Sequence, residues 1–162
     1  SSILDIGRTE GAQFEQPKNI DLVEFIKYKT NDYNMLASKK SITIKFSSNV
    51  SSFQIIIQET LFNQILQNFV QNAIKFTPNG KTIKIKLKKI DDKVILNVID
   101  EGIGIDENID VFAPFKKVGK ENGVGLGLYL AKIASDALNA KISIKNREDG
   151  KTGAIAKLEL TL

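Results

Sequence analysis

The segment ETLFNQILQNFVQNAIKF (59–76) most constrains the fold, because it carries apolar side chains around most of a helix. The apolar residues that recur at every fourth position, with their flanking neighbours, are Leu61, Ile65, Phe69, Ala73, Phe62, Leu66, Val70 and Ile74. A helix that is apolar on several sides has to be covered on several sides. We therefore predict a largely buried helix over 59–76, ended by the turn TPNG (77–80).

The other periodic segments predict strands in consecutive pairs and two further helices. Alternating or continuous apolar residues predict strands at 41–46, 53–57, 81–90, 93–100, 140–146 and 153–162. Helices are expected at 22–40, with Asp21 as the N-cap, and at 124–138. Strands in pairs disfavour a doubly wound parallel sheet, so we expect a mixed sheet with helices on one face. The strand at 93–100 is apolar on both faces, as a central strand would be.

The composition excludes several kinds of chemistry. The 162 residues contain no cysteine and no histidine, which removes disulfides, thiolate nucleophiles, histidine bases and Cys/His metal sites. No stretch approaches the ~18 apolar residues of a membrane-spanning helix. The net charge is +4, yet many lysines alternate with apolar residues, as in TIKIKLKK (82–89), which is typical of a solvated sheet face. We therefore expect neither a nucleic-acid partner nor membrane contact by this domain.

The segment NGVGLGLYLAKI (122–133) places Gly123, Gly125 and Gly127 directly before an apolar, helix-like run. Glycine lets backbone N–H groups approach an anion closely, and a helix N-terminus directs unpaired N–H groups at the same place. The spacing differs from the dinucleotide pattern G-x-G-x-x-G and from the Walker pattern. A phosphate-binding turn and a flexible loop before a core helix explain these glycines equally well.

The segment DEGIGI (100–105) follows the expected central strand. Asp100 ends that strand, and Gly102 and Gly104 form a turn that can lie beside a planar base. An ionised carboxylate only accepts hydrogen bonds, so it suits the amino group of adenine and rejects the oxo group of guanine. A solvated aspartate in a glycine turn is the alternative.

Three polar residues share one face of the helix expected at 59–76: Asn68, Asn72 and Lys75. Asparagine is a mediocre helix former, so two of them on a buried helix require an explanation. Amide oxygens are hard ligands that suit Mg²⁺, and Mg²⁺ usually bridges substrate phosphates. Lys75 lies one turn further on, where it can pair with a phosphate. A polar stripe facing water is the alternative for each residue alone.

Together these motifs resemble the catalytic ATP-binding domain of bacterial sensor histidine kinases, in the superfamily of gyrase, Hsp90 and MutL ATPases. The matching segments are the N-box NQILQNFVQNAIKFTPNG (63–80), the G1 box DEGIGI (100–105), the F-box VFAPF (111–115) and the G2 box GVGLGLYLAK (123–132). They occur in the family's order, over roughly residues 20–162. The resemblance implies an α+β fold, a two-layer α/β sandwich with a mixed sheet packed against three helices.

The resemblance also implies roles for the motif residues. Asp100 would hold the adenine amino group, Asn72 with Asn68 near it would hold Mg²⁺, Lys75 would reach a phosphate, and Phe76 would pack beside the nucleotide. The full set of implied cofactor-binding residues is Asn68, Asn72, Lys75, Phe76, Asp100, Gly102, Gly104, Ile105, Phe112, Phe115, Lys117, Gly123, Val124, Gly125, Leu126 and Gly127.

A short lid is implied at 116–122, hinged at Phe112 and Phe115. Its candidate phosphate contacts, for which a solvated lid is an equally good explanation, are Lys116, Lys117 and Lys120. The sequence departs from the family's pattern in two places, at the adenine contact and at the position that activates water in the ATPase branch. Ala154 and Ile155 stand where a hydroxyl group usually supports the adenine contact, and Asn68 stands where the ATPase branch has a glutamate. Asparagine cannot act as a general base, so we expect slow hydrolysis and transfer to an outside nucleophile.

The implied activity is that of a protein-histidine kinase in a two-component system, with ATP and Mg²⁺ as cofactors. The segment ILDIGRTEGAQFE (3–15) resembles the end of a helical dimerisation domain. We therefore expect residues 1–16 to be a remnant of that domain and residues 17–162 to be the ATP-binding domain. The phosphoacceptor histidine would lie upstream, so this chain would bind Mg²⁺-ATP without phosphorylating itself, and it would hold no catalytic residue of its own.

The implied partners are ATP or ADP, the upstream phosphoacceptor domain, the receiver domain of a response regulator, and a second copy of the parent protein. A cytoplasmic location is expected, and the sequence leaves open whether the parent is anchored in a membrane. Three alternatives remain: an anti-sigma-type Ser/Thr kinase, a superfamily ATPase, and an interaction module with a degenerate nucleotide site. The residues before Ser1 and calorimetry with ATP would separate them.

Overall fold

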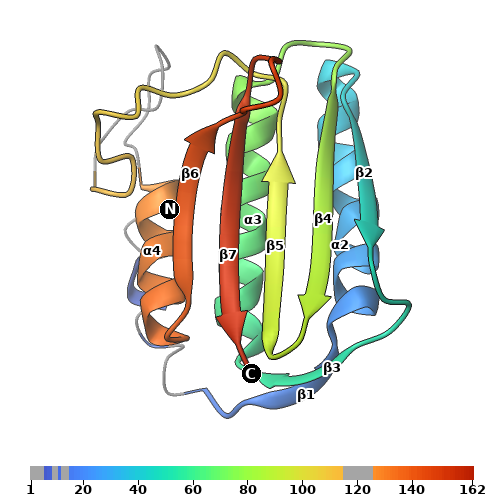
Figure 1. Cartoon of the computed structure of the whole chain (residues 1–162), viewed down its shortest axis with the longest axis vertical. Coiled ribbons are helices and arrows are strands. Elements are labelled where there is room, and N and C mark those ends of the chain that lie inside the picture. The colour runs from blue at the N-terminus through green and yellow to red at the C-terminus, as the bar shows by residue number, and fades with distance from the viewer. Residues whose placement is uncertain (1–5, 9–10, 12–14, 115–125) are drawn as a thin grey trace.

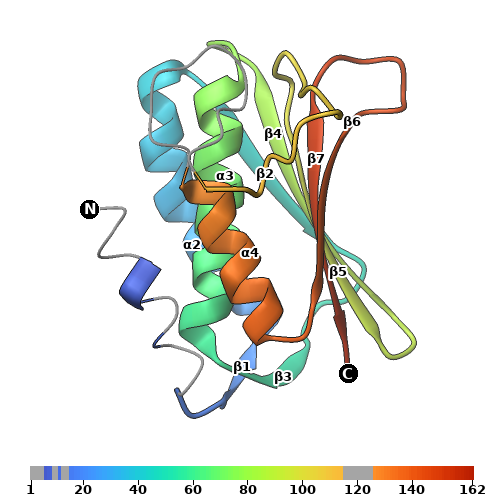
Figure 2. The same cartoon turned by 90° about the vertical axis from the view of Figure 1, so that its left-hand side faces the viewer.

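A five-stranded sheet is covered on one face by three helices in the computed structural model, which describes residues 6–8, 11, 15–114 and 126–162 (Figure 1, Figure 2). The helices are α2 (Leu22–Ala37), extended by a 3-10 turn (Ser38–Lys40), α3 (Glu59–Phe76) and α4 (Gly127–Ala137). The strands are β1 (Lys18–Asp21), β2 (Thr43–Ser48), β3 (Gln54–Ile57), β4 (Thr82–Ile90), β5 (Lys93–Ile99), β6 (Lys141–Asn146) and β7 (Ala154–Thr161).

The main sheet has the strand order β2-β4-β5-β7-β6, so β5 is the central strand, as its sequence predicts. The pair β2–β4 is parallel, and the other three pairs are antiparallel. Leu87, Leu96 and Leu158 are neighbours in register on three adjacent strands and are buried on the helix-facing side. The expected α+β fold with a mixed sheet and helices on one face is confirmed.

Helix α3 lies between α2 and α4, behind the central strands of the sheet (Figure 1). Its predicted bounds agree with the structure, and both rows of its apolar side chains are buried. Phe62 of α3 meets Phe25 of α2 edge to face, with ring centroids 5.8 Å apart. Cover from the sheet on one side and from a helix on either flank explains why the segment is apolar around most of its girth.

Strand β1 is absent from the sequence-based prediction, which assigned Asp21 the role of a helix cap. Residues 18–21 pair antiparallel with β3 in a separate two-stranded sheet, and the N–H of Leu22 continues the pairing by donating to the carbonyl of Phe53 at 2.8 Å. The segment KNID contains only Ile20 as an apolar residue, so it lacks the alternation of apolar and polar residues that indicates a strand. Pairing with a distant segment, rather than local propensity, forms it.

Other differences concern the ends of elements. The helix expected to reach residue 40 ends at Ala37 and tightens into the 3-10 turn, which ends at Ser41 with a left-handed backbone (φ 54°). Strand β2 therefore begins at Thr43 instead of Ser41. Helix α4 begins at Gly127, whereas its expected start, Val124, lies outside the described residues.

Residues 6–8 are helical, and the domain boundary expected at residues 16–17 stays a prediction. Within the described part of the chain, no helix combines the length and the apolar character needed to cross a membrane.

The carboxylate of Asp21 fixes the start of α2, as predicted, and also joins it to the segment before β3. Its Oδ1 accepts hydrogen bonds from the N–H groups of Val23 (3.0 Å), Glu24 (3.3 Å) and Phe53 (3.3 Å), and its Oδ2 accepts the Ser52 hydroxyl (2.6 Å). The hydrogen bond from Ser52, followed by the backbone bonds, lowers the pKa of Asp21.

We predict that Asp21→Ala lowers the free energy of unfolding by about 1–2 kcal/mol at pH 7, the usual cost of losing an N-cap. Because the folded-state pKa of Asp21 is lowered, its contribution is complete above the ordinary aspartate pKa and is lost as the pH falls through the lowered value. Urea unfolding at pH 7 and at about pH 3 should therefore show a smaller difference from the wild type in acid. An equal loss in Asp32→Ala, at an exposed position of the same helix, would contradict this role for the cap.

Candidate functional site

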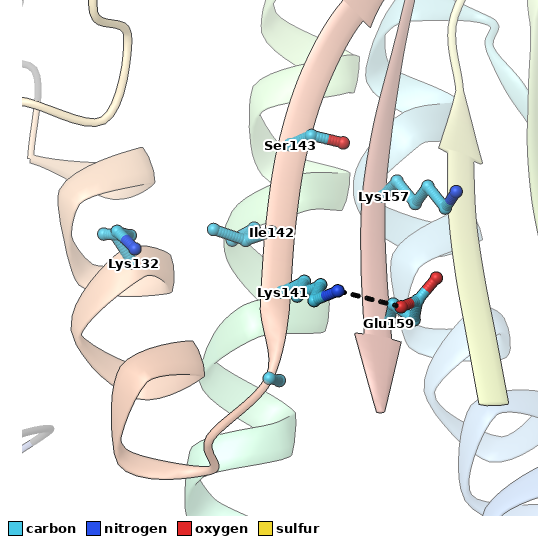
Figure 3. A pocket seen from close by; sticks show the side chains of 7 residues that line it. Lys132, Lys141, Ile142, Ser143, Lys157 and Glu159 are labelled. Atoms are coloured by element: carbon cyan, nitrogen blue, oxygen red, sulfur yellow. Dashed lines mark ion pairs between the residues drawn. The ribbon is translucent and has the colours of Figure 1, made fainter. Parts of the chain in front are cut away.

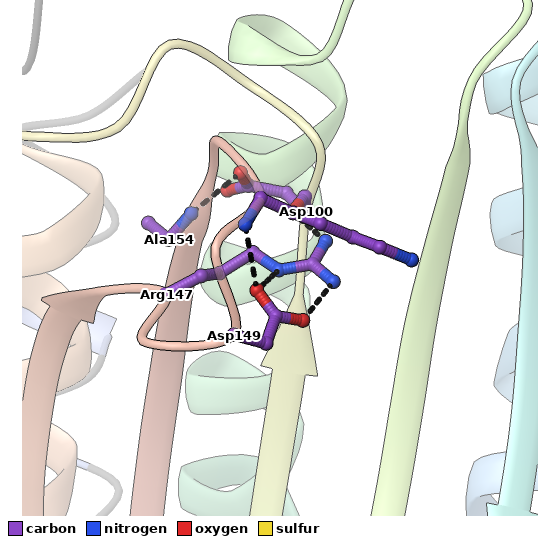
Figure 4. Close-up of polar contacts among 5 residues, drawn as sticks. Asp100, Arg147, Asp149 and Ala154 are labelled. Carbon is purple, nitrogen blue, oxygen red and sulfur yellow. Dashed lines mark hydrogen bonds and ion pairs between the residues drawn. The ribbon is translucent and has the colours of Figure 1, made fainter.

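Asp100 lies at the end of the central strand β5, with its carboxylate turned toward the first residue of β7 (Figure 4). Its side chain is buried (6% exposed), and Oδ1 accepts hydrogen bonds from the N–H groups of Gly102 and Ala154, both at 2.9 Å. The backbone N–H of Asp100 in turn donates to the carbonyl of Ala154 at 3.0 Å. The carboxylate is thus held between its own loop and the neighbouring strand.

Burial raises the pKa of Asp100, because the charged form loses water. The hydrogen bonds from Gly102 and Ala154 and the positive charge of Arg147 act in the opposite direction. Both amide hydrogen bonds fall on Oδ1, so neither uses Oδ2. An ionised carboxylate held in this way is a fixed acceptor for a donor group of a ligand.

The loop after Asp100 packs against the end of α3. A Cβ atom at Gly102 would lie 2.6 Å from the carbonyl oxygen of Phe76, the last residue of α3, so a side chain at 102 does not fit. Lys75 is exposed, and its Nζ lies 5.6 Å from the centroid of the Phe76 ring. Thr77, which sequence reasoning missed, is buried (1% exposed), and its hydroxyl has no hydrogen-bond partner among the described residues.

Asn68 and Asn72 lie on α3 and face different surroundings. Asn68 is buried (6% exposed), and its Nδ2 has no hydrogen-bond partner within the part of the chain that the structure describes. Its Oδ1 faces the start of α4, where a Cβ atom at Gly127 would lie 3.5 Å away. Asn72 is half-buried one turn further along, toward Phe76. A buried amide without a partner is rare, and it suits a group that a ligand completes.

Asn146, at the end of β6, fixes the second half of the Asp100 loop. Its side-chain amide accepts from the N–H of Ile105 at 2.7 Å and donates to the carbonyl of Ile105 at 2.9 Å. Gly104 has φ +83°, and a Cβ atom there would lie 2.5 Å from Oδ1 of Asn146. A single asparagine at a strand end carries no local signal for this role, which is why sequence reasoning missed it.

Of the other predicted site residues, some lie within the described part of the chain and the rest lie outside it. Phe112 is half-buried and packs against the core beside Val111, whereas Leu126 is buried directly before Gly127. The predicted residues that lie outside the described part of the chain are Phe115, Lys116, Lys117, Lys120, Gly123, Val124 and Gly125.

A metal ion at this site would depend on amide oxygens. Among the described residues, no group of three or more carboxylate, histidine or cysteine side chains is placed to hold one. Asn68 and Asn72 offer amide oxygens, so the remaining ligands would have to be water and the oxygens of a bound substrate.

A hollow of about 470 Å³ lies beside strand β6, away from Asp100 (Figure 3). Its lining residues are Lys132, Ala140, Lys141, Ile142, Ser143, Lys157 and Glu159. Glu159 lies 4.0 Å from the ammonium group of Lys141 and 3.7 Å from that of Lys93. None of the predicted site residues lines it.

Comparisons with known proteins agree with the arrangement of the motifs. The family model described as Histidine kinase-, DNA gyrase B-, and HSP90-like ATPase matches residues 57–162. The chain is 31% identical to the sensor protein KdpD of Clostridium acetobutylicum, in a match that covers 98% of this chain and 18% of that protein. The chain therefore spans less than a fifth of the length of this relative.

Solved structures share the fold. The catalytic domain of the histidine kinase ThkA, in a nucleotide-free form, matches with a TM-score of 0.80 at 30% identity, over 90% of this chain and 95% of that one. ThkA in complex with the response regulator protein TrrA matches with a TM-score of 0.75 at 28% identity, over 90% of this chain and 41% of that one.

Full-length ShkA in complex with AMPPNP matches with a TM-score of 0.84 over 98% of this chain and 34% of that one, and at 24% identity this likeness supports the fold alone. The family model covers well over half of the chain, and the relatives agree with it. The chain belongs to the family of histidine kinase-, DNA gyrase B- and HSP90-like ATPases, as the catalytic ATP-binding domain of a two-component sensor histidine kinase.

Proposed function

We propose that this domain binds Mg²⁺-ATP between the Asp100 loop, α3 and the start of α4, and presents the γ-phosphate to a histidine on another domain of the parent protein. The observation that carries the proposal is the buried carboxylate of Asp100, fixed by two backbone N–H groups in a domain of an ATP-binding family. Membership of this ATPase family supports a nucleotide at such a site.

Asp100 would recognise adenine through its free carboxylate oxygen. Oδ1 already accepts from Gly102 and Ala154, so Oδ2 would accept the amino group of the base. Guanine presents an oxo group in the same place, and two acceptors would then face each other without a proton between them. The side chains of Ala154 and Ile155 have no polar group that could add a contact.

Asn68 and Asn72 would hold the metal through their amide oxygens. The buried Nδ2 of Asn68, which has no partner among the described residues, would donate a hydrogen bond to an oxygen of the bound phosphates. Mg²⁺, when bound, would neutralise charge on the phosphates. Lys75 is exposed at the end of the same face of α3, where its ammonium group would pair with a phosphate. The expected contacts of Phe115, Lys117, Gly123, Val124 and Gly125 stay predictions.

The chain's own part in the reaction would be positioning rather than covalent chemistry. Asn68 has no basic carboxylate to activate water, so bound ATP would be held rather than hydrolysed quickly. Phosphoryl transfer needs an acceptor in line with the γ-phosphate, and this chain contains no histidine. The acceptor would lie on the helical dimerisation domain of the cytoplasmic parent dimer. The complex of ThkA with TrrA supports a receiver domain as the next acceptor.

We predict that Asp100→Asn weakens ATP binding by about 10- to 100-fold, as expected for losing a hydrogen bond to a charged group. Affinity for GTP should change less or improve, because an amide can donate to the guanine oxo group. Calorimetry with both nucleotides measures the change in discrimination. The matched control is Asp92→Asn, an exposed aspartate at the other end of β5, which should bind ATP as the wild type does. Unchanged ATP affinity in Asp100→Asn would contradict the assigned base pocket.

We predict that Asn72→Ala lowers ATP affinity at least about tenfold in Mg²⁺ and much less in EDTA, because it removes a metal ligand and leaves the base pocket intact. Titration of a fluorescent ATP analogue in each buffer gives both affinities. Gln71→Ala changes an exposed neighbour on α3 and should leave both unchanged. Equal losses with and without the metal would show that Asn72 supports the fold instead.

We predict that the isolated chain binds ATP but acquires no phosphate from it, because it has no histidine. Incubation with γ-labelled ATP, with and without a separate helical domain that carries the acceptor histidine, tests this directly. Label should appear on the added domain alone. Label on the isolated chain would refute the prediction, and rapid release of phosphate would favour a superfamily ATPase.

A further inference from the structure

The loop between β6 and β7 carries an arginine that reaches back to the strand of Asp100 (Figure 4). Nη1 of Arg147 donates to the backbone carbonyl of Asp100 at 3.0 Å. Its Nε and Nη2 donate to the two carboxylate oxygens of Asp149 at 3.2 and 2.7 Å. The guanidinium group therefore joins Asp149, within the loop, to the main chain of the adenine-recognising residue.

The backbone of the loop is fitted to this contact. The N–H of Arg147 donates to the carbonyl of Gly153 at 3.0 Å. Gly153 has φ +135°, and a Cβ atom there would collide with the carbonyl oxygen of Asp100 and lie 2.9 Å from Cδ of Arg147. Only glycine allows the loop to approach Asp100 this closely.

Asp149 is fixed independently of Asp100. Its Oδ1 accepts the N–H of Lys151 at 3.1 Å, and the hydrogen bond from Arg147 is the main reason that its pKa is lowered. The side chain of Arg147 is only 9% exposed, whereas that of Asp149 is 51% exposed. Burying a guanidinium group is costly unless it is paired and hydrogen-bonded, and a hairpin loop at the surface does not require one. The guanidinium group of Arg147 is satisfied by two partners, the carboxylate of Asp149 and the carbonyl of Asp100.

We infer that Arg147, held in place by Asp149, is a positioning residue that keeps Asp100 oriented and ionised as the acceptor for adenine. This inference rests on the proposed function of Asp100. The guanidinium group fixes the main chain of Asp100 through its carbonyl, which the carboxylate hydrogen bonds do not use, and it places a positive charge near a buried negative one. The side chains of Ala154 and Ile155 cannot supply such support, because they are apolar.

The charge of Arg147 gives the inference a pH-dependent readout. Among the described residues, Arg147, which is paired with Asp149, contacts the main chain of Asp100, and the neighbouring Glu101 accepts the N–H of Thr82 through Oε2 at 2.7 Å. Three further charged side chains line the same hollow as Arg147 and Glu101: Lys45, Lys84 and Lys151. Burial raises the pKa of Asp100 and Arg147 opposes that rise. Removing the positive charge should therefore raise the pKa of Asp100 further, so that ATP binding begins to fail at a higher pH.

The test compares Arg147→Gln, Arg147→Lys and Asp149→Asn with Lys145→Gln, an exposed position of β6 that undergoes the same loss of charge as Arg147→Gln. ATP affinity is measured by calorimetry from pH 5 to 8. Arg147→Gln should weaken ATP binding about tenfold at pH 7. It should also raise the pH below which the affinity for ATP falls. Arg147→Lys keeps the charge but not the planar guanidinium group, so it should weaken ATP binding without changing the pH at which the affinity falls. Lys145→Gln should match the wild type.

A second measurement separates this inference from the proposed function. The Asp100 carboxylate is titrated by NMR in the nucleotide-free protein, and its midpoint should rise in Arg147→Gln and not in Lys145→Gln. An unchanged midpoint, or a loss of ATP affinity that is equal at every pH and follows a loss of folding stability, would overturn the role of Arg147. If Asp100→Asn retains full ATP affinity, the base pocket is misassigned, and a raised midpoint would still support the action of Arg147 on Asp100.

Discussion

The buried carboxylate of Asp100 is the interaction on which the site depends. Two backbone N–H groups fix it, one from its own loop and one from the first residue of β7. Because Ala154 is also paired with Asp100 through its carbonyl, the register between β5 and β7 decides whether the carboxylate is satisfied. A slip of one residue would turn every side chain of β7 to the other face of the sheet and remove this donor. Recognition of the base is therefore tied to strand pairing.

Helix α3 combines two requirements that conflict locally. Its apolar rows must be buried between the sheet, α2 and α4, yet it also presents Asn68 and Asn72, and the buried Nδ2 of Asn68 finds no partner among the described residues. An unsatisfied buried polar group costs stability. Where sequence and packing disagree in this way, a functional site is the usual reason. Asn68 indicates a ligand because it is buried among these apolar rows and its Oδ1 faces the start of α4.

The sequence was sufficient to predict those features that arise from local periodicity. The bounds of α3, the central place of β5 and the cap at Asp21 follow from apolar spacing and side-chain chemistry. Strand β1 could not be predicted, because only Ile20 in it is apolar and its pairing with β3 is long-range. The contacts of Asn146 with Ile105 and of Arg147 with Asp100 join positions more than 40 residues apart and leave no local pattern, so only the folded chain reveals them.

The two halves of the proposed site come from different layers of the sandwich. Asp100 and its supports lie on the sheet and its loops, whereas Asn68 and Asn72 lie on α3. The contact of Gly102 with the end of α3 and the packed core between the layers set the spacing of the two halves. Protein interiors are close-packed, so a change of core volume would shift one half relative to the other. A nucleotide that contacts both layers would stabilise the domain by mass action, which couples the affinity for ATP to the packing of the core.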